Sequence, residues 1–249
     1  MVMTIPEIRP GTLALELVLS LPKVNSLIST LQFKTYSPLP ILEERLVSSK
    51  DEAVERILEE ASNLRTIASK NLFPYWESVL IAALATDKNE MFVREAAKHD
   101  PNNEAIERFE LSVNDLVDGA LQGRIEALSE NEVIALCSTC TLVDGSTRHI
   151  PMMDYRILPD SKSVCVVKEA LNAIDRTNGV ILKSGRSYHF YGFDLLRQND
   201  WIKFLARSLL LAPLTDSRYI AHRLLEGAGA LRITSSKLKP NVPIVELCL

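Results

Sequence analysis

A serine and a histidine two positions apart, Ser187 and His189, lie in the segment SGRSYHFYG at residues 184–192. On a β-strand, side chains two apart share a face, so both are expected opposite the aromatic Tyr188. A polar pair on one face of a strand suits a surface that binds or reacts with a ligand. The alternative is a half-buried strand whose histidine is only hydrogen-bonded.

Two further blocks, HIPMMD and TDSRYIAHR, contribute an acid each, Asp154 and Asp216. The order is a hairpin, a strand ending in Asp154, a helix, the Ser-x-His strand and then Asp216. This order resembles the catalytic core of the archaeo-eukaryotic primase superfamily, the primase-polymerases. In that family a hydrophobic strand ends in Asp-x-Asp or Asp-x-Glu, a small-x-His strand follows, and a last strand ends in one acid. The resemblance covers about residues 131–249.

The resemblance implies a set of roles for these residues. Asp154 and Asp216 would hold Mg²⁺ or Mn²⁺, and Ser187 and His189 would contact the phosphates of the incoming nucleotide, so Asp154, Asp216 and His189 are the expected catalytic residues. Paired divalent ions on carboxylate oxygens neutralise the charge that phosphoryl transfer must move.

Arg156 departs from the family pattern, since it stands where the second carboxylate is expected. Alternation places it on the same face as Asp154, where a cation opposes metal binding. Three outcomes are open. Arg156 could turn away to bind phosphate, another acid such as Asp160 or Glu169 could replace the missing ligand, or the chain could have lost two-metal chemistry and kept a nucleotide or nucleic-acid pocket.

Three more arginines, Arg218, Arg223 and Arg232, are candidates for nucleotide binding together with Arg156. A guanidinium group suits bidentate recognition of phosphate. The alternative for any single one is a surface ion pair with Asp216 or Glu226, which contributes little.

The elements that must position these residues divide the chain in two. Apolar residues at helical spacing predict helices in the first half, and two prolines predict an extended connector before them; the helices are expected over 51–70, 74–86, 89–99 and 104–128, and the connector over 34–45. From residue 131 the order reads β-β-α-β-β-α-β, with a hairpin at Asp144-Gly145. We therefore predict an α+β fold, in which an acidic helical region, 1–130, precedes a primase-like, mostly antiparallel sheet domain, 131–249, with flanking helices and an RRM-like half.

Charge is divided in the same way. Residues 150–249 carry 14 Lys+Arg and 9 Asp+Glu, a balance of +5, and residues 1–149 carry the remaining 14 and 23, a balance of −9, which sum to the net −4 of the chain. A basic second half suggests anionic ligands.

The sequence has no apolar run long enough to span a bilayer and no leader pattern, so we expect a cytoplasmic protein without membrane contact. Cys137 and Cys140 lack the second pair that a zinc site needs.

These observations predict a primase-polymerase-like nucleotidyltransferase, acting in DNA replication or repair on a nucleoside triphosphate and a single-stranded or primer-template nucleic acid. One alternative is a non-catalytic relative that binds nucleotide or nucleic acid, which Arg156 favours. Another is an interaction protein whose helical half binds a protein partner.

Overall fold

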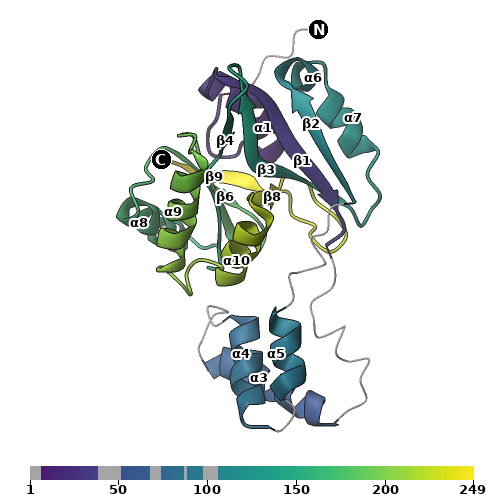
Figure 1. Cartoon of the computed structure of the whole chain (residues 1–249), viewed down its shortest axis with the longest axis vertical. Coiled ribbons are helices and arrows are strands. Elements are labelled where there is room, and N and C mark those ends of the chain that lie inside the picture. Colours follow the sequence, from purple (N-terminus) through teal and green to yellow (C-terminus); the bar gives the residue numbers. More distant parts are fainter. Residues whose placement is uncertain (1–6, 39–51, 68–73, 87–88, 98–105) are drawn as a thin grey trace.

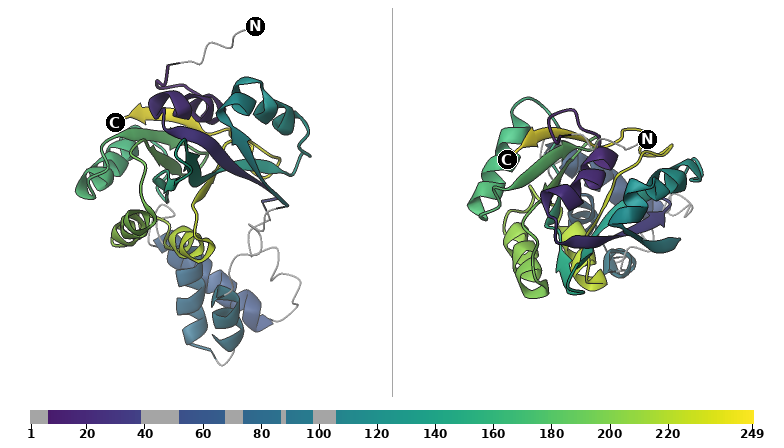
Figure 2. Two further views of the ribbon diagram at one scale, coloured as in Figure 1. Left: turned by 45° about the horizontal axis from the view of Figure 1, so that its top comes forward. Right: turned by 90° about the horizontal axis from the view of Figure 1, so that it is seen from above.

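The computed structural model describes residues 7–38, 52–67, 74–86, 89–97 and 106–249. Its core is a pair of antiparallel β-sheets with helices against them, and a group of three helices lies beside this core (Figures 1 and 2). The expected α+β class is confirmed.

The first sheet has the strand order β2-β1-β3-β4, and β8 also pairs with β3. Its strands are β1 (Ile28–Tyr36), β2 (Glu107–Ser112), β3 (Val133–Leu142), β4 (Thr147–His149) and β8 (Ala230–Arg232). Three helices accompany these strands in the chain, namely α1 (Ala14–Val24), α6 (Val113–Val117) and α7 (Ala120–Glu126). Apolar residues of α1, α6 and α7 join the sheet in one hydrophobic core.

The second sheet has the order β5-β7-β6-β9. Its strands are β5 (Met152–Tyr155), β6 (Gly179–Lys183), β7 (Tyr188–Gly192) and β9 (Ile244–Cys248). Three helices cover its outer face, namely α8 (Ser163–Ala173), α9 (Gln198–Leu209) and α10 (Ser217–Glu226) (Figure 1).

Alternation along β5 and β7 assigns their side chains to two separate cores. Met152 and Tyr191 are buried in the core shared with the first sheet. Met153 and Phe190 are buried in the other core, against α8, α9 and α10. The face that carries Asp154 and the Ser-x-His residues therefore looks towards the first sheet.

A small helical group is inserted between β1 and β2. It comprises α3 (Glu52–Ile67), α4 (Tyr75–Leu84) and α5 (Asn89–Ala97), which share a small core of their own. The group meets α10 through two polar contacts: the Ser217 hydroxyl donates to Glu77 at 3.0 Å, and Arg218 donates to the Ala96 carbonyl at 2.8 Å. The Arg218 guanidinium also lies over the Trp76 ring, 5.0 Å from its centroid.

Two strands lie in the half of the chain that was expected to be a helical region. Residues 107–112, expected within a helix over 104–128, form β2, and residues 34–36 of the expected connector end β1. The rest of that connector from residue 39 lies outside the described residues. Because β1 pairs with β2 and with β3, one sheet crosses the boundary expected at residue 130.

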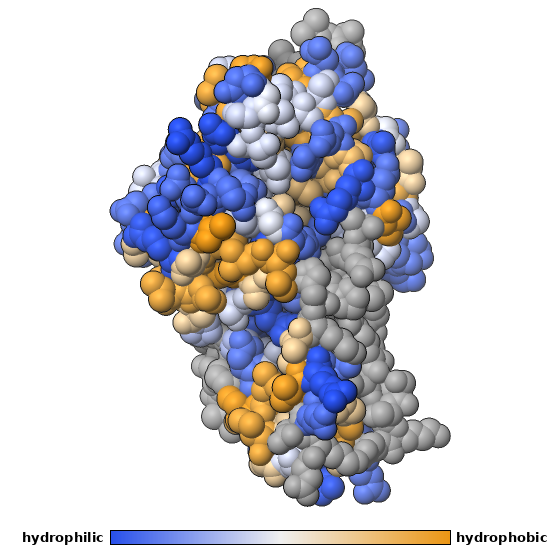
Figure 3. All heavy atoms as spheres, in the orientation of Figure 1, coloured by the Kyte–Doolittle hydropathy of each residue, from blue (hydrophilic) through white to orange (hydrophobic). Residues whose placement is uncertain are grey.

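Apolar side chains also reach the surface. Figure 3 shows them gathered over α9 and α10 and again over the inserted helices; the most exposed in and next to these elements include Leu84, Leu210 and Leu225. That the helical half binds a protein partner stays a prediction. The apolar surface over the inserted helices would suit such a partner. Within the described residues, no helix combines the length and the apolar character that crossing a bilayer requires.

Candidate nucleotide site

The β5–β7 ladder brings Asp154 and His189 together, since the two residues are direct partners across the strands. His189 Nε2 lies 4.0 Å from Asp154 Oδ1, which is too long for a hydrogen bond. Ser187, just before β7, lies close enough to the Asp154 carboxylate to lower its pKa. Three residues expected in one site from the sequence are therefore neighbours, and their roles stay predictions.

Asp216 reaches the same place through the backbone. Its N–H donates to the Asp154 carbonyl at 3.1 Å, and the Arg156 N–H donates to the Leu214 carbonyl at 2.8 Å. Thr215 thus pairs with Tyr155 of β5 through an isolated β-bridge. Asp216 also caps α10, because its Oδ1 accepts hydrogen bonds from the backbone N–H groups of Arg218 and Tyr219.

Arg156 pairs with Asp216. Its Nε lies 3.8 Å from Asp216 Oδ2, and both side chains are largely shielded from water. Arg156 does not turn away, as the first of the three outcomes required: its guanidinium stays at the site and offsets the charge of Asp216.

Two further cations border the centre. Arg232, on β8, donates to the Ser184 hydroxyl at 3.0 Å and to the carbonyls of Thr234 and Asn241. Lys239 is close enough to Asp154 and Arg232 to respond to the charge of each.

The surroundings of Asp154 and His189 disfavour their charged forms. Burial raises the pKa of Asp154 from 3.8 to about 7, and the nearby charge of Asp216 acts in the same direction. Burial lowers the pKa of His189 well below its usual value, and Arg232 and Lys239 lower it further. His189 is therefore neutral at neutral pH, so the contact with Asp154 is not an ion pair.

The carboxylates present do not fit a two-ion site. Asp216 Oδ1 is occupied by the helix cap and Oδ2 faces Arg156. Among the described residues, Asp154 Oδ1 and His189 Nδ1 are buried without a hydrogen-bond partner. Two divalent ions need several free carboxylate oxygens, and no three His, Cys, Asp or Glu side chains in the described ranges gather as metal ligands.

Two of the expected arginines have other contacts. Arg218 lies over Trp76 and bonds to α5, so it joins the inserted helices to α10. Arg223 is buried and pairs with Glu226 at 2.9 Å. Of the replacement acids considered beside Arg156, Asp160 is engaged elsewhere, because the backbone N–H groups of Lys162 and Ser163 donate to its Oδ1.

Two tyrosines at the site were not expected from the sequence. Burial raises the pKa of Tyr36 to about 12. The charge of Asp154 acts in the same direction, and the charges of Arg232 and Arg223 act against it. Burial likewise raises the pKa of Tyr219, which responds to Arg223, Asp154 and Glu226. Tyr36 lies outside the motif blocks and reaches Asp154 only through the pairing of β1 with β3. Tyr219 lies within the block TDSRYIAHR, and the course of α10 brings it to Asp154.

Taken together, an acid-bearing strand, a small-x-His strand and a late acid on an antiparallel sheet define a primase-like protein. The profile of the AEP-like family, archaeo-eukaryotic primase 1D-like, matches residues 112–244, which is more than half of the chain. The chain belongs to this family, and the expected resemblance is confirmed. The match begins before residue 131 and takes in α6 and α7. No curated protein and no solved structure matches the chain.

Proposed function

We propose that this primase-fold protein binds a nucleoside triphosphate at the Asp154–His189 centre and does so without paired metal ions. The observation that carries the proposal is that His189, neutral and with a free Nδ1 among the described residues, faces Asp154 beside Arg232 and Lys239. The two cations attract phosphate, and neutral imidazole donates a hydrogen bond without competing for them.

The protonation of Asp154 supports the same proposal. A carboxylate beside a triphosphate would repel it, whereas a carboxyl group whose pKa is about 7 is largely neutral below that pH. Arg156 acts in the same direction because it offsets the charge of Asp216. Little negative charge at the centre therefore opposes the binding of an anion. Membership of a primase family supports a nucleic-acid strand as a second ligand.

The test is a calorimetric titration of a non-hydrolysable nucleoside triphosphate in the presence of a chelator. We expect His189→Ala and Arg232→Met each to weaken binding by about tenfold or more, as loss of a charge-assisted or buried hydrogen bond does. Arg148→Met, on β4, is the matched control and should bind as the wild type does. Equal binding by all of these variants would place the nucleotide elsewhere.

A second candidate is metal-dependent nucleotidyl transfer, with Mg²⁺ or Mn²⁺ on Asp154 and Asp216. The observation that favours it is the buried Asp154 Oδ1, which has no hydrogen-bond partner in the described chain and lies beside a second acid. It requires Arg156 to leave Asp216. Primer extension with Mn²⁺ tests it: extension by the wild type and none by Asp154→Asn would support transfer.

A further inference from the structure

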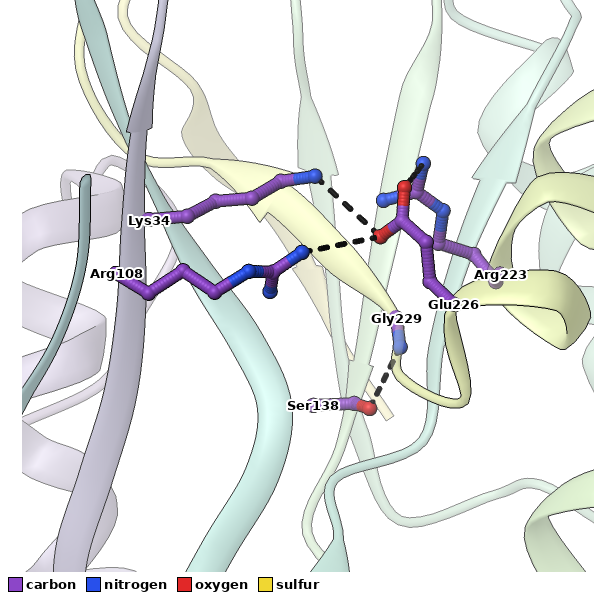
Figure 4. Close-up of polar contacts among 6 residues, drawn as sticks. All are labelled: Lys34, Arg108, Ser138, Arg223, Glu226 and Gly229. Carbon is purple, nitrogen blue, oxygen red and sulfur yellow. Dashed lines mark hydrogen bonds and ion pairs between the residues drawn. The ribbon is translucent and has the colours of Figure 1, made fainter. Parts of the chain in front are cut away.

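Three cations from separate elements surround one carboxylate between the first sheet and α10. Lys34 of β1 and Arg108 of β2 approach Glu226 Oε2 at 3.5 and 4.0 Å, and Arg223 of α10 lies 2.9 Å from Glu226 Oε1 (Figure 4). We refer to Lys34, Arg108 and Arg223 as the basic cluster. None of the catalytic roles that the resemblance implies involves Lys34, Arg108 or Glu226.

The basic cluster runs from the interior to the surface. The side chains of Lys34 and Arg223 are 1% and 3% exposed, Glu226 is 10% exposed and Arg108 is 56% exposed. Burial lowers the pKa of Lys34, and the charge of Arg223 lowers it further, which shows how closely the two cations approach. Placing cations so near one another out of water is costly unless anions offset their charge. An incoming anion would meet Arg108 first.

Arg223 retains unused hydrogen-bonding capacity. Its Nε is buried and has no hydrogen-bond partner among the described residues, although Nη2 is bonded to Glu226. A guanidinium group can bind an oxyanion with two parallel N–H donors. A tetrahedral anion with several oxygens could therefore use donors that one carboxylate leaves unused.

Glu226 stands where a carboxylate is electrostatically disfavoured and where the backbone can turn. It is the last residue of α10, and a helix C-terminus repels negative charge. Gly227 follows with φ 73°, and Gly229 is held to β3 by the Ser138 hydroxyl at 2.8 Å. The carboxylate thus lies on a short connection between a helix end and a fixed point, held in place by the cations around it.

We propose that Lys34, Arg108 and Arg223 bind a phosphate group of a nucleic-acid strand, and that Glu226 occupies this position until the strand displaces it. The inference rests on the proposed function, because it gives the strand a place beside the nucleotide centre. Glu226 is then an internal competitor, and its removal should strengthen the binding of the strand.

The cluster is next to the nucleotide centre and distinct from it. Tyr36 responds to the charges of both Arg223 and Asp154, and so does Tyr219, so the tyrosines lie between the two sets of groups. The charges that shift Asp154 and His189 come from Asp216, Arg232, Lys239 and Arg156, and none comes from the basic cluster. A second phosphate position outside the nucleotide centre suits an extended polyanion better than the triphosphate itself.

The test measures binding of a labelled single-stranded oligonucleotide to the full chain by fluorescence anisotropy, over a range of salt concentrations. Glu226→Gln should tighten binding by about tenfold, because the phosphate no longer competes with a carboxylate. Lys34→Met and Arg108→Gln should weaken it and lower the slope of log affinity against log salt by about 0.7 for each phosphate charge that is no longer neutralised. Arg124→Gln, an exposed arginine that pairs with Glu107, is the matched control and should change neither quantity.

Every outcome decides between explanations. If the basic cluster only joins β1 to α10, Glu226→Gln will not tighten strand binding, and the inference fails even though the triphosphate still binds. If Lys34→Met weakens triphosphate binding and leaves strand binding unchanged, the site serves the nucleotide and the strand assignment is wrong. If the wild type binds no triphosphate, the proposed function fails first. Thermal unfolding of each variant separates loss of binding from loss of fold, and the gain expected for Glu226→Gln cannot arise from misfolding.

Discussion

At the residue scale, the Arg156 guanidinium lies where the family resemblance places a second carboxylate, and it pairs with Asp216. The same exchange of an acid for a base removes a metal ligand and lessens repulsion of a phosphate. Under the proposed function, this one residue would alter both the metal binding and the anion affinity of the centre. The two effects can be separated by substitution.

Arg156→Asp should restore an acid-x-acid pair on β5. We expect Mn²⁺ to tighten triphosphate binding to this variant by about tenfold or more, since divalent ions are held by several carboxylate oxygens. Calorimetric titration with and without Mn²⁺ measures the effect. Arg148→Asp, which adds the same charge on β4, should show no such response, and a response equal to that of Arg156→Asp would mean that the charge alone is responsible.

The raised pKa of Asp154 predicts a dependence of stability on pH. The folded pKa is about 7 and the ordinary value is 3.8, so between these values the folded state binds a proton that the unfolded state has released. Stability from this group is therefore present at low pH and is lost as pH rises towards about 7, with a total of about 4 kcal/mol, of which about 3 kcal/mol falls between pH 5 and pH 8. Urea unfolding near pH 5 and pH 8 should show this difference between wild type and Asp154→Asn. An identical pH dependence in the two proteins would contradict the assignment.

Individual residues show which parts of the site the sequence could predict and which parts it could not. Asp154, Ser187 and His189 could be predicted because a strand period of two fixes their face and their blocks follow a known order. The contacts of Arg218 could not, because the inserted helices that it meets are far away in the sequence. Lys34 and Tyr36 precede the motifs by more than a hundred residues, and only strand pairing brings them to the site.

At the element scale, β1 and β2 are the strands that the sequence did not reveal. Phe33 faces Phe109 in register, and both rings are buried and stacked with centroids 5.3 Å apart. The segment ERFELS alternates as a strand does, but it is short and lies between stretches of helical composition. Local pattern could not decide it, whereas pairing with β1 does.

The β6–β7 pair that carries His189 depends on close approach of two strands. A Cβ added to Gly179 would clash with the Tyr191 carbonyl and lie 2.8 Å from the Phe190 ring. We expect Gly179→Ala to lower the free energy of unfolding by about 3 kcal/mol or more, as overpacking of a core does. Urea unfolding measures the change. Gly123→Ala, in α7 with open space around its Cβ, should instead raise stability by about 0.5–1 kcal/mol, and equal effects at both positions would show that close approach is not the cause.

At the scale of the whole molecule, the inserted helices are separable from the sheets in topology. β1 and β2 are antiparallel neighbours that pair up to Thr35 and Glu107, and the Ile106 N–H donates to the Thr35 carbonyl at 2.8 Å. The two ends of the insertion therefore meet at one edge of the first sheet. The insertion touches α10 through Ser217 and Arg218, in the first turn of that helix.

Replacing residues 39–105 by a short Gly-Ser linker should leave the two sheets folded. We expect triphosphate affinity to change by less than about threefold, because a flexible loop between adjacent strand ends adds little closure cost. Near-UV circular dichroism and calorimetry check the fold and the binding. Loss of binding with the fold intact would show that the insertion completes the nucleotide site.

The central claim is that the Asp154–His189 centre binds a triphosphate without a pair of metal ions, and one measurement tests it most directly. A non-hydrolysable nucleoside triphosphate is titrated onto the wild-type protein in chelator and then in Mn²⁺. We expect binding under both conditions, with affinities within about threefold of each other, because Arg232, Lys239 and neutral His189 supply the contacts. Binding that appears only with Mn²⁺ would contradict this claim and show that Asp154 and Asp216 act as metal ligands despite Arg156.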